Sequence, residues 1–359
     1  QVERLDRRAA LLVAEAEVAG VLNAYGYAMD ARRWDEAAAF FAPDGTLEIG
    51  QEGVYVGPAS IRRGLNRYGP QGLRDGERND HVYLQTLISV APDGRTAAAR
   101  GVELIFSAGP AGTNGELGEG TFENTFVRID DAWMIQSVHF YPRMIVDAAT
   151  GWAESARPAP GPSTEFPPDR LPTESYEIYP TFSVAPFHFD NPVTGRAPQY
   201  PEAYFSAPRA NAASDDAGSG SAPTTAAVSE PARDRAEIES QLAVAERAAE
   251  EARAYDAIEN LISAFGYARD GVALDEGRTS FVSHVVQPVI EMADDGGSAN
   301  VRARLLELQG ISGGPGGWAA GIYRGTAVKR NGSWVLERFD LERSWSGPYP
   351  GGWAQPSTD

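Results

Sequence analysis

The sequence predicts an α+β protein that contains two related domains, and three observations carry this prediction. An apolar stripe with helical spacing opens the chain and is followed by long alternating segments with turn signals between them. One phrase occurs twice, as YGYAMDARRWDE at 25–36 and as FGYARDGVALDE at 265–276, and the two copies align without a gap. The length of 359 residues is enough for two domains.

The helical part of the first domain is expected to come first. Apolar spacing and a Pro at a first helical position predict three helices, over 11–29, over 34–42 and from Gly57-Pro58 onward. Phe40 and Phe41 should turn inward from the second helix. Two short strands, 46–49 and 54–56, are expected after the turn at 43–45.

An antiparallel sheet should follow the helices. Alternating apolar residues and turn signals predict four long strands, over 81–90, 95–106, 121–129 and 133–141. A Pro-rich, aromatic-rich stretch without periodicity then fills 147–208, and we expect it to lie as an arm on a domain surface. Small and polar residues at 209–235 are typical of a flexible linker. The complete domain is therefore expected at 1–146 and the second domain at 236–359.

The two copies differ in one block. Between the shared Asp-Glu and the next His, the first copy has 44 residues (37–80) and the second has seven (277–283). The absent block would close one end of a pocket, so we expect a single pocket, in the first domain. The second domain is then a truncated, structural copy whose sheet packs on the first sheet as an internal pseudo-dimer, with homo-oligomerisation through these sheets as the alternative.

Composition excludes several classes of function. A net charge of −19 disfavours nucleic acid and anionic membrane surfaces as partners. No apolar run approaches the roughly 18–20 residues of a membrane span. There is no Cys, the four His residues lack metal-ligand spacing, and no glycine-rich nucleotide motif follows a strand, so we expect neither metal nor cofactor. A start at Gln1 slightly favours a periplasmic or secreted protein over a cytoplasmic one.

The order of motifs in the first domain resembles a known superfamily. The motifs are YGYAMDARRWD, APDG, a helix that begins with GPASI, and the hairpin that contains DAW. This order resembles the nuclear transport factor 2-like (NTF2-like) superfamily, and within it the SnoaL-like and scytalone dehydratase-like proteins, over 10–145 and in part over 236–345. The resemblance implies a cone-shaped, cystatin-like α+β barrel that encloses a pocket.

The same resemblance implies catalytic residues. His81 takes the place of the general base and Asp30 that of its helix partner, with Tyr25 or Tyr27 polarising the substrate. An imidazole titrates near neutral pH and can carry a proton there. Asp30 has a second interpretation, as a residue that terminates the helix, because an Asp recurs in the other copy. Tyr25 is replaced by Phe265, so its hydroxyl belongs to the complete copy alone.

A second group of residues is expected to bind the substrate. Phe122 and Asn124 alternate onto one face of a strand, where an amide among apolar side chains is typical of a ligand pocket. Phe106 stands near the place of a second pocket His in the dehydratases. The remaining candidates are polar or aromatic residues near the ends of elements: Trp34, His139, Tyr141 and Arg143.

The predicted function is that of a cofactor-independent lyase on a small aromatic molecule, phenolic or polyketide-like. Loss of water is the family-typical reaction, and loss of formaldehyde from a lignin-derived phenolic dimer is a second version. Two alternatives stay open, because this fold hosts many activities. One is a non-catalytic binding protein, and the other is an isomerase or epoxide hydrolase.

Overall fold

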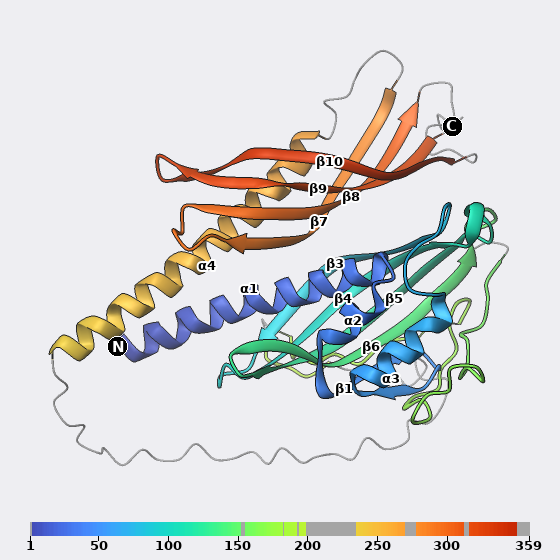
Figure 1. Ribbon diagram of the computed structural model, residues 1–359, viewed down its shortest axis with the longest axis horizontal. Helices are drawn as coiled ribbons and strands as arrows, with labels where there is room; N and C mark the ends of the chain where they lie inside the picture. Colours follow the sequence, from blue (N-terminus) through green and yellow to red (C-terminus); the bar gives the residue numbers. More distant parts are fainter. Residues whose placement is uncertain are drawn as a thin grey trace.

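The computed structural model describes residues 2–151, 155–181, 183–191, 194–198, 235–269, 278–311 and 316–349. It contains two sheets, each with its own long helix (Figure 1). The first sheet has the strand order β2-β1-β6-β5-β4-β3 and the second has the order β10-β9-β8-β7. The predicted α+β, cystatin-like architecture is confirmed for the first domain, and a second four-stranded sheet is present as expected.

The first domain places its helices against one side of a curved sheet. Its elements are α1 (Val2–Asp30), α2 (Trp34–Ala39), β1 (Phe41–Ile49), β2 (Val54–Val56), α3 (Gly57–Leu65), β3 (Arg78–Val90), β4 (Thr96–Ala108), β5 (Glu116–Ile129) and β6 (Ala132–Asp147). The prediction of a helix over 34–42 was too long, because Phe41 already begins β1. β1 pairs in parallel with β6, and Phe41 becomes a buried strand residue.

The second domain has one helix and four antiparallel strands. These are α4 (Arg235–Arg269), β7 (Arg278–Met292), β8 (Ser298–Ile311), β9 (Gly316–Arg330) and β10 (Ser333–Tyr349). Within the described ranges it has no counterpart of α2, β1, β2 or α3. Its core of Ile, Val, Ala and Tyr side chains lies between α4 and the sheet.

The repeated Gly of the opening phrase has a packing role in both copies. A Cβ on Gly26 would lie 2.9 Å from the Tyr83 ring, and one on Gly266 would lie 3.3 Å from Val285. In each domain the helix therefore approaches the first long strand at this glycine, where a side chain would collide at Gly26 and would be tightly packed at Gly266. The recurrence of this residue reflects how helix and sheet pack.

A β-bulge marks the same point in both copies. Gln85 and Gln287 both have positive φ, 53° and 54°, and each interrupts the pairing of its strand with the next one. Aligning the bulges, 202 residues apart, matches His81 with Ser283 and Val82 with His284. The sequence match of His81 with His284 was therefore wrong by one position. His284 is exposed, whereas His81 is buried.

The two domains meet chiefly through helices. α1 packs against α4 and β7 (Figure 1). Its Asn23 and Tyr27 side chains donate hydrogen bonds to the carbonyls of Pro288 (2.7 Å) and Gln287 (2.8 Å). The predicted packing of sheet on sheet was thus wrong for most of the interface. The sheets also touch, where β3 packs against β7 and where Phe106 packs on the rings of Trp318 and Trp345.

Helix α1 also corrects an expectation about apolar length. Its segment Leu5–Asp30 contains an 18-residue window with a mean hydropathy of 1.2, so it is long and apolar enough, by length and composition only, to cross a membrane. The prediction that no apolar run approaches this length was therefore wrong. In the structure Ala14, Val18 and Leu22 on this helix are buried in the core of the first domain, which accounts for the apolar composition.

The arm after β6 lies along the first domain. Tyr179 donates its backbone N–H to Arg143, and His188 contacts Glu123 at 2.7 Å and Ser89 at 3.2 Å. The predicted linker at 209–235 falls outside the described residues except for its last position. His188 therefore lies on the sheet face that carries Glu123, which points away from the cavity lined by Phe122 and Asn124.

Candidate active site

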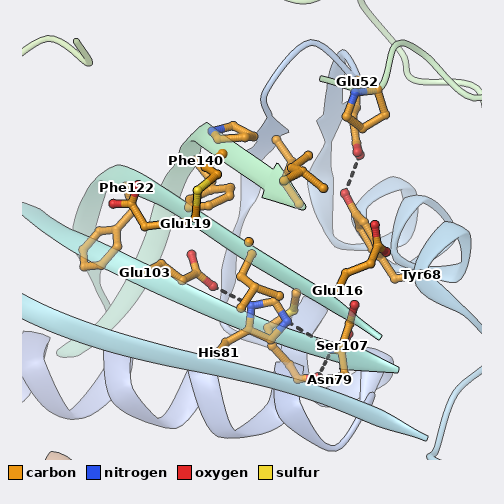
Figure 2. A pocket seen from close by; sticks show the side chains of 18 of the residues that line it. Glu52, Tyr68, Asn79, His81, Glu103, Ser107, Glu116, Glu119, Phe122 and Phe140 are labelled. Carbon is orange, nitrogen blue, oxygen red and sulfur yellow. Dashed lines mark hydrogen bonds and ion pairs between the residues drawn. The ribbon is translucent and has the colours of Figure 1, made fainter. Parts of the chain in front are cut away.

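The first domain encloses a cavity of about 430 Å³ between the sheet and α1 (Figure 2). Aromatic and aliphatic side chains form most of its wall. The polar or ionisable residues in its wall are Tyr25, Glu52, Tyr68, Asn79, His81, Tyr83, Glu103, Ser107, Glu116, Glu119, Asn124 and Arg157. A mostly apolar space with a few convergent polar groups is the usual form of a small-molecule site.

His81 is held from both ring nitrogens. Its Nδ1 lies 2.5 Å from Oε1 of Glu103, and its Nε2 lies 3.0 Å from the amide nitrogen of Asn79 (Figure 2). The same amide nitrogen donates to the carbonyl of Met29 at 2.8 Å. An amide nitrogen can only donate, so Nε2 accepts and Nδ1 carries the proton that it gives to Glu103. The neutral ring therefore presents its basic lone pair at Nε2.

The surroundings of His81 adjust its proton affinity. Burial alone would lower the pKa of His81, but the hydrogen bond from its ring to Glu103 and the negative charge of that carboxylate raise it, and the net pKa lies above the usual value. Both side chains are buried, with exposed fractions of 9% and 6%. The pair resembles a base and its orienting carboxylate.

A second acid lies at another part of the cavity wall. The Tyr68 hydroxyl donates to Glu52 (Figure 2). Arg67 lies 3.1 Å from the same carboxylate. Burial, opposed by Arg67 and by the Tyr68 hydrogen bond, raises the pKa of Glu52 to about 7. Glu52 can therefore hold or release a proton near neutral pH.

Two tyrosines complete the polar wall near the imidazole. Tyr25 from α1 and Tyr83 from β3 both line the cavity and are almost fully buried. Burial and the charge of Glu103 raise the pKa of each phenol. Both therefore stay protonated and can donate a hydrogen bond to an oxygen in the cavity.

The structure brings four of the predicted site residues together. Tyr25, His81, Phe122 and Asn124 all line the cavity. Phe122 packs on Tyr83 with ring centroids 5.1 Å apart, and the Asn124 side-chain oxygen accepts the backbone N–H of His139 at 3.3 Å. Asn124 is thus partly engaged in holding β6 in place.

Tyr27 and Asp30 point away from the cavity, so their predicted placement in it was wrong. The Tyr27 ring lies under the guanidinium of Arg302 at 4.0 Å. Asp30 accepts the backbone N–H of His81 at 2.7 Å and pairs with Arg304. Asp30 therefore holds the backbone of the base, while Glu103 takes the place expected for it beside the imidazole.

Trp34 and Phe106 also lie elsewhere, and their predicted contact with substrate was wrong. Trp34 is fully buried in the core and donates to the carbonyl of Gly69 at 3.0 Å. Phe106 faces the second domain, 5.8 Å from the Trp318 ring and 5.9 Å from the Trp345 ring. Its neighbour Ile105 is the residue that faces the cavity, as strand alternation requires.

His139, Tyr141 and Arg143 lie on the face of β6 that does not form the cavity wall. Val138, Phe140, Pro142 and Met144 line the cavity instead. The His139 and Tyr141 rings stack at 3.9 Å, and burial lowers the pKa of His139 to about 4. Arg143 pairs with Glu119. The predicted place of these three residues in the substrate pocket was therefore wrong, because strand alternation turns them to the opposite face of β6.

Several cavity residues were missed, although alternation could have found two of them. Asn79 and Tyr83 stand two positions either side of His81 and must share its face. Glu103 pairs with Tyr83 across β3 and β4, and this register places the Glu103 carboxylate beside the His81 ring. The register depends on a β-bulge that no sequence signal predicts. Glu52 and Tyr68 come from connecting segments, whose paths alternation does not predict.

Comparison with known proteins agrees with the fold. Residues 10–139 match the family model described as a SnoaL-like domain. No curated protein matches the sequence. The structure is similar to ActVI-ORFA from Streptomyces coelicolor, with 22% identity, 35% of this chain and 95% of that chain covered and a TM-score of 0.32.

Two further solved structures are similar. An NTF2-like protein with a cystatin-like fold from Novosphingobium aromaticivorans has 19% identity, coverage of 40% and 90% and a TM-score of 0.32. A type 2 hexachlorocyclohexane dehydrochlorinase (LinA) has 15% identity, coverage of 39% and 92% and a TM-score of 0.34. These similarities are too distant to assign a reaction. Over residues 10–139, this chain is similar to the SnoaL-like proteins of the NTF2-like superfamily.

Proposed function

We propose that the first domain is a cofactor-independent lyase that acts on a small aromatic molecule, phenolic or polyketide-like, with His81 as the proton carrier. The observation that carries this proposal is the buried contact between His81 and Glu103 in the wall of an apolar cavity. A base that is oriented by a carboxylate and shielded from water is suited to abstracting a proton from a bound molecule.

In a dehydration, Nε2 of neutral His81 takes a proton from the carbon next to the C–O bond. The electrons of the broken C–H bond form the double bond, and the C–O electrons leave with the hydroxyl oxygen. That oxygen takes a proton, from the imidazolium or from protonated Glu52, and departs as water. Because Nε2 becomes a donor in this step, the Asn79 amide must give up its hydrogen bond to that atom.

A loss of formaldehyde uses the same base. His81 takes the proton of a hydroxymethyl O–H, and the electrons of that bond form the carbonyl of formaldehyde. The C–C bond breaks, its electrons stay on the carbon that remains with the aromatic molecule, and this carbon takes a proton. Tyr25 and Tyr83, as neutral donors in the cavity wall, can stabilise negative charge on a phenolic oxygen.

The shape and lining of the cavity support the proposed substrate class. A volume of about 430 Å³ suits a small molecule rather than a polymer. Phe122, Phe140, Met29 and Ile105 supply apolar surface for an aromatic ring. The polar residues supply donors and acceptors for hydroxyl groups.

The experiment that tests the proposal is incubation of the full chain with a panel of phenolic dimers and hydroxylated polyketides. Mass spectrometry then follows the loss of water or formaldehyde. The proposal expects loss from at least one compound that also binds. Binding without any chemical change would support the non-catalytic binding protein, and rearrangement without loss of mass would support an isomerase.

The Glu103→Gln variant is expected to shift the pH dependence. His81 must be neutral to accept a proton, so kcat/KM rises with pH through the pKa of this residue. Without the carboxylate charge that raises it, this pKa falls and the rising limb moves to lower pH. The plateau should drop by roughly 10- to 100-fold, because a weaker, less well-oriented base transfers protons more slowly.

Rates measured across the pH range for wild type and Glu103→Gln would check this expectation. The matched control is Glu123→Gln, which removes a carboxylate from the other face of the same sheet, where it pairs with Arg100. It should leave the position of the limb unchanged. A limb that stays in place in Glu103→Gln would show that Glu103 does not control the proton affinity of the base.

A further inference from the structure

A buried ion cluster joins the second domain to the strand that carries His81. Its centre is Arg304 of β8, which is 1% exposed. This guanidinium pairs with Asp30, lies 3.6 Å from Asp80 and donates to the side chain of Gln287 at 2.7 Å. A buried charge is tolerated only when it is paired and hydrogen-bonded, and both domains contribute to the pairing.

The cluster reaches the proposed base through two atoms of one carboxylate. Asp30 uses Oδ2 for Arg304 and Oδ1 for the backbone N–H of His81, at 2.7 Å. Arg304 of the second domain and the backbone of His81 therefore contact the same carboxylate. Asp30 from the first domain is the link between them.

The outer face of the same strand is held by an aromatic residue of the second domain. Trp345 of β10 donates from Nε1 to Asp80 at 2.7 Å, and the guanidinium of Arg78 stacks on its ring at 3.8 Å. Residues 78 and 80 point to the second domain, so Asn79 and His81 point into the cavity. The start of β3 is thus fixed from outside while it presents the base inside.

We propose that the second domain is a working part of the site, in which Arg304 is a positioning residue that sets the orientation and charge environment of His81 through Asp30. This inference rests on the proposed function of His81. It replaces the expectation that the truncated copy is a purely structural partner.

The position of Arg304 in the repeat supports a dedicated role. Bulge alignment matches it with Val102 of the first copy, an apolar residue. The arginine is therefore not part of what the two copies share. Its charge is retained in a buried place because Asp30 and Asp80 raise the pKa of Arg304 against the opposing effect of burial.

The charge of Arg304 also acts on the imidazole. The charged groups that face His81 are Glu103 from β4 and Asp30 from α1, which raise its pKa, and Arg304 from β8, which lowers it. Removing the positive charge while Asp30 stays ionised should therefore raise the pKa of His81. A residue that only stabilised the contact between the domains would not change the pKa of His81.

The test compares Arg304→Gln with Arg302→Gln in the full chain. Arg302 lies two residues earlier on β8 and stacks on Tyr27, so it is a matched interface arginine. It forms no ion pair with Asp30 among the described residues, and the Asp30 charge affects it less than Tyr27 does. NMR titration of the His81 ring, assigned with His81→Gln, and steady-state kinetics on a compound from the panel are the readouts.

Arg304→Gln is expected to raise the His81 pKa and to lower kcat at least tenfold while KM changes less than threefold. Arg302→Gln should change neither quantity. Arg304→Lys, which keeps the charge and loses the planar fork, should restore the His81 pKa and only part of kcat, and it also serves as the variant for kinetics if Arg304→Gln does not fold.

An unchanged His81 pKa in folded Arg304→Gln would overturn the inference, as would equal changes in the Arg302→Gln control. If Arg304→Gln does not fold, full kcat in Arg304→Lys would overturn it. These results are separable from failure of the proposed function. If His81→Ala retains full turnover, the lyase mechanism fails, while the NMR titration still decides whether Arg304 acts on the imidazole.

Discussion

Replacing His81 with alanine is expected to lower kcat by about 10²- to 10⁴-fold on any compound of the panel that the wild type converts, the usual contribution of a positioned general acid or base. The loss should be in the chemical step, since apolar residues such as Phe122 and Phe140 still line the cavity. KM should therefore change little. Steady-state kinetics on folded protein, checked by circular dichroism, measures both quantities.

His284→Ala is the matched control for this result. His284 occupies a neighbouring position in the second copy, but it is exposed and lines none of the cavity wall. It should retain the turnover of the wild type. Undiminished turnover in His81→Ala would remove His81 from the mechanism, and equal losses in both variants would point to a non-specific effect on folding.

Trp34→Ala is expected to destabilise the first domain by about 3–5 kcal/mol, the typical cost of truncating a large buried aromatic residue. Trp34 is fully buried and belongs to the core between α1, α2 and α3. The change would leave a cavity and also remove the hydrogen bond to the carbonyl of Gly69. Chemical denaturation measures the free energy of unfolding directly.

Trp34→Phe serves as the conservative comparison, because it keeps most of the apolar volume and loses the indole N–H. Its cost should be clearly smaller than that of Trp34→Ala. Turnover per folded molecule should stay within about threefold of the wild type in both variants, since Trp34 is not part of the cavity wall. A stable Trp34→Ala protein with a strongly raised KM would instead indicate that Trp34 contacts the substrate.

Much of the fold could be predicted from the sequence because its signals are local. The apolar stripe of α1, the turn at 92–94 and the paired hairpin of β5 and β6 each follow from a few neighbouring residues. The length of the block between the shared Asp-Glu and the next His also revealed which copy lacks the elements that close a pocket. These signals need no knowledge of distant contacts.

The site was harder to predict because it depends on which face each strand presents. His81, Phe122 and Asn124 were placed in the cavity, whereas His139 and Tyr141 lie on the opposite face of β6. A shift of one residue in register moves every side chain of a strand to the other face. The pairing of Asn124 with Val138 decides the matter, and it is visible only in the folded sheet.

The interface between the domains explains another group of errors. Tyr27, Asp30 and Phe106 have the residue types of a catalytic site, but they meet the second domain instead. Buried polar groups at a domain interface need partners just as those at an active site do. From the sequence alone these two situations look the same, and the partners Arg302, Arg304 and Trp318 lie far along the chain.

The central claim is that one cavity, in the first domain, holds the substrate beside His81. The most direct test is a crystal structure of the His81→Ala variant soaked with a compound that the wild type converts. The expected result is the intact compound inside the cavity, with its reacting group facing the vacated imidazole position and Asn79. The same compound bound instead outside the cavity, in the groove between α1 and the second sheet that Tyr27, Arg302 and Arg324 line, with the cavity empty, would contradict this claim.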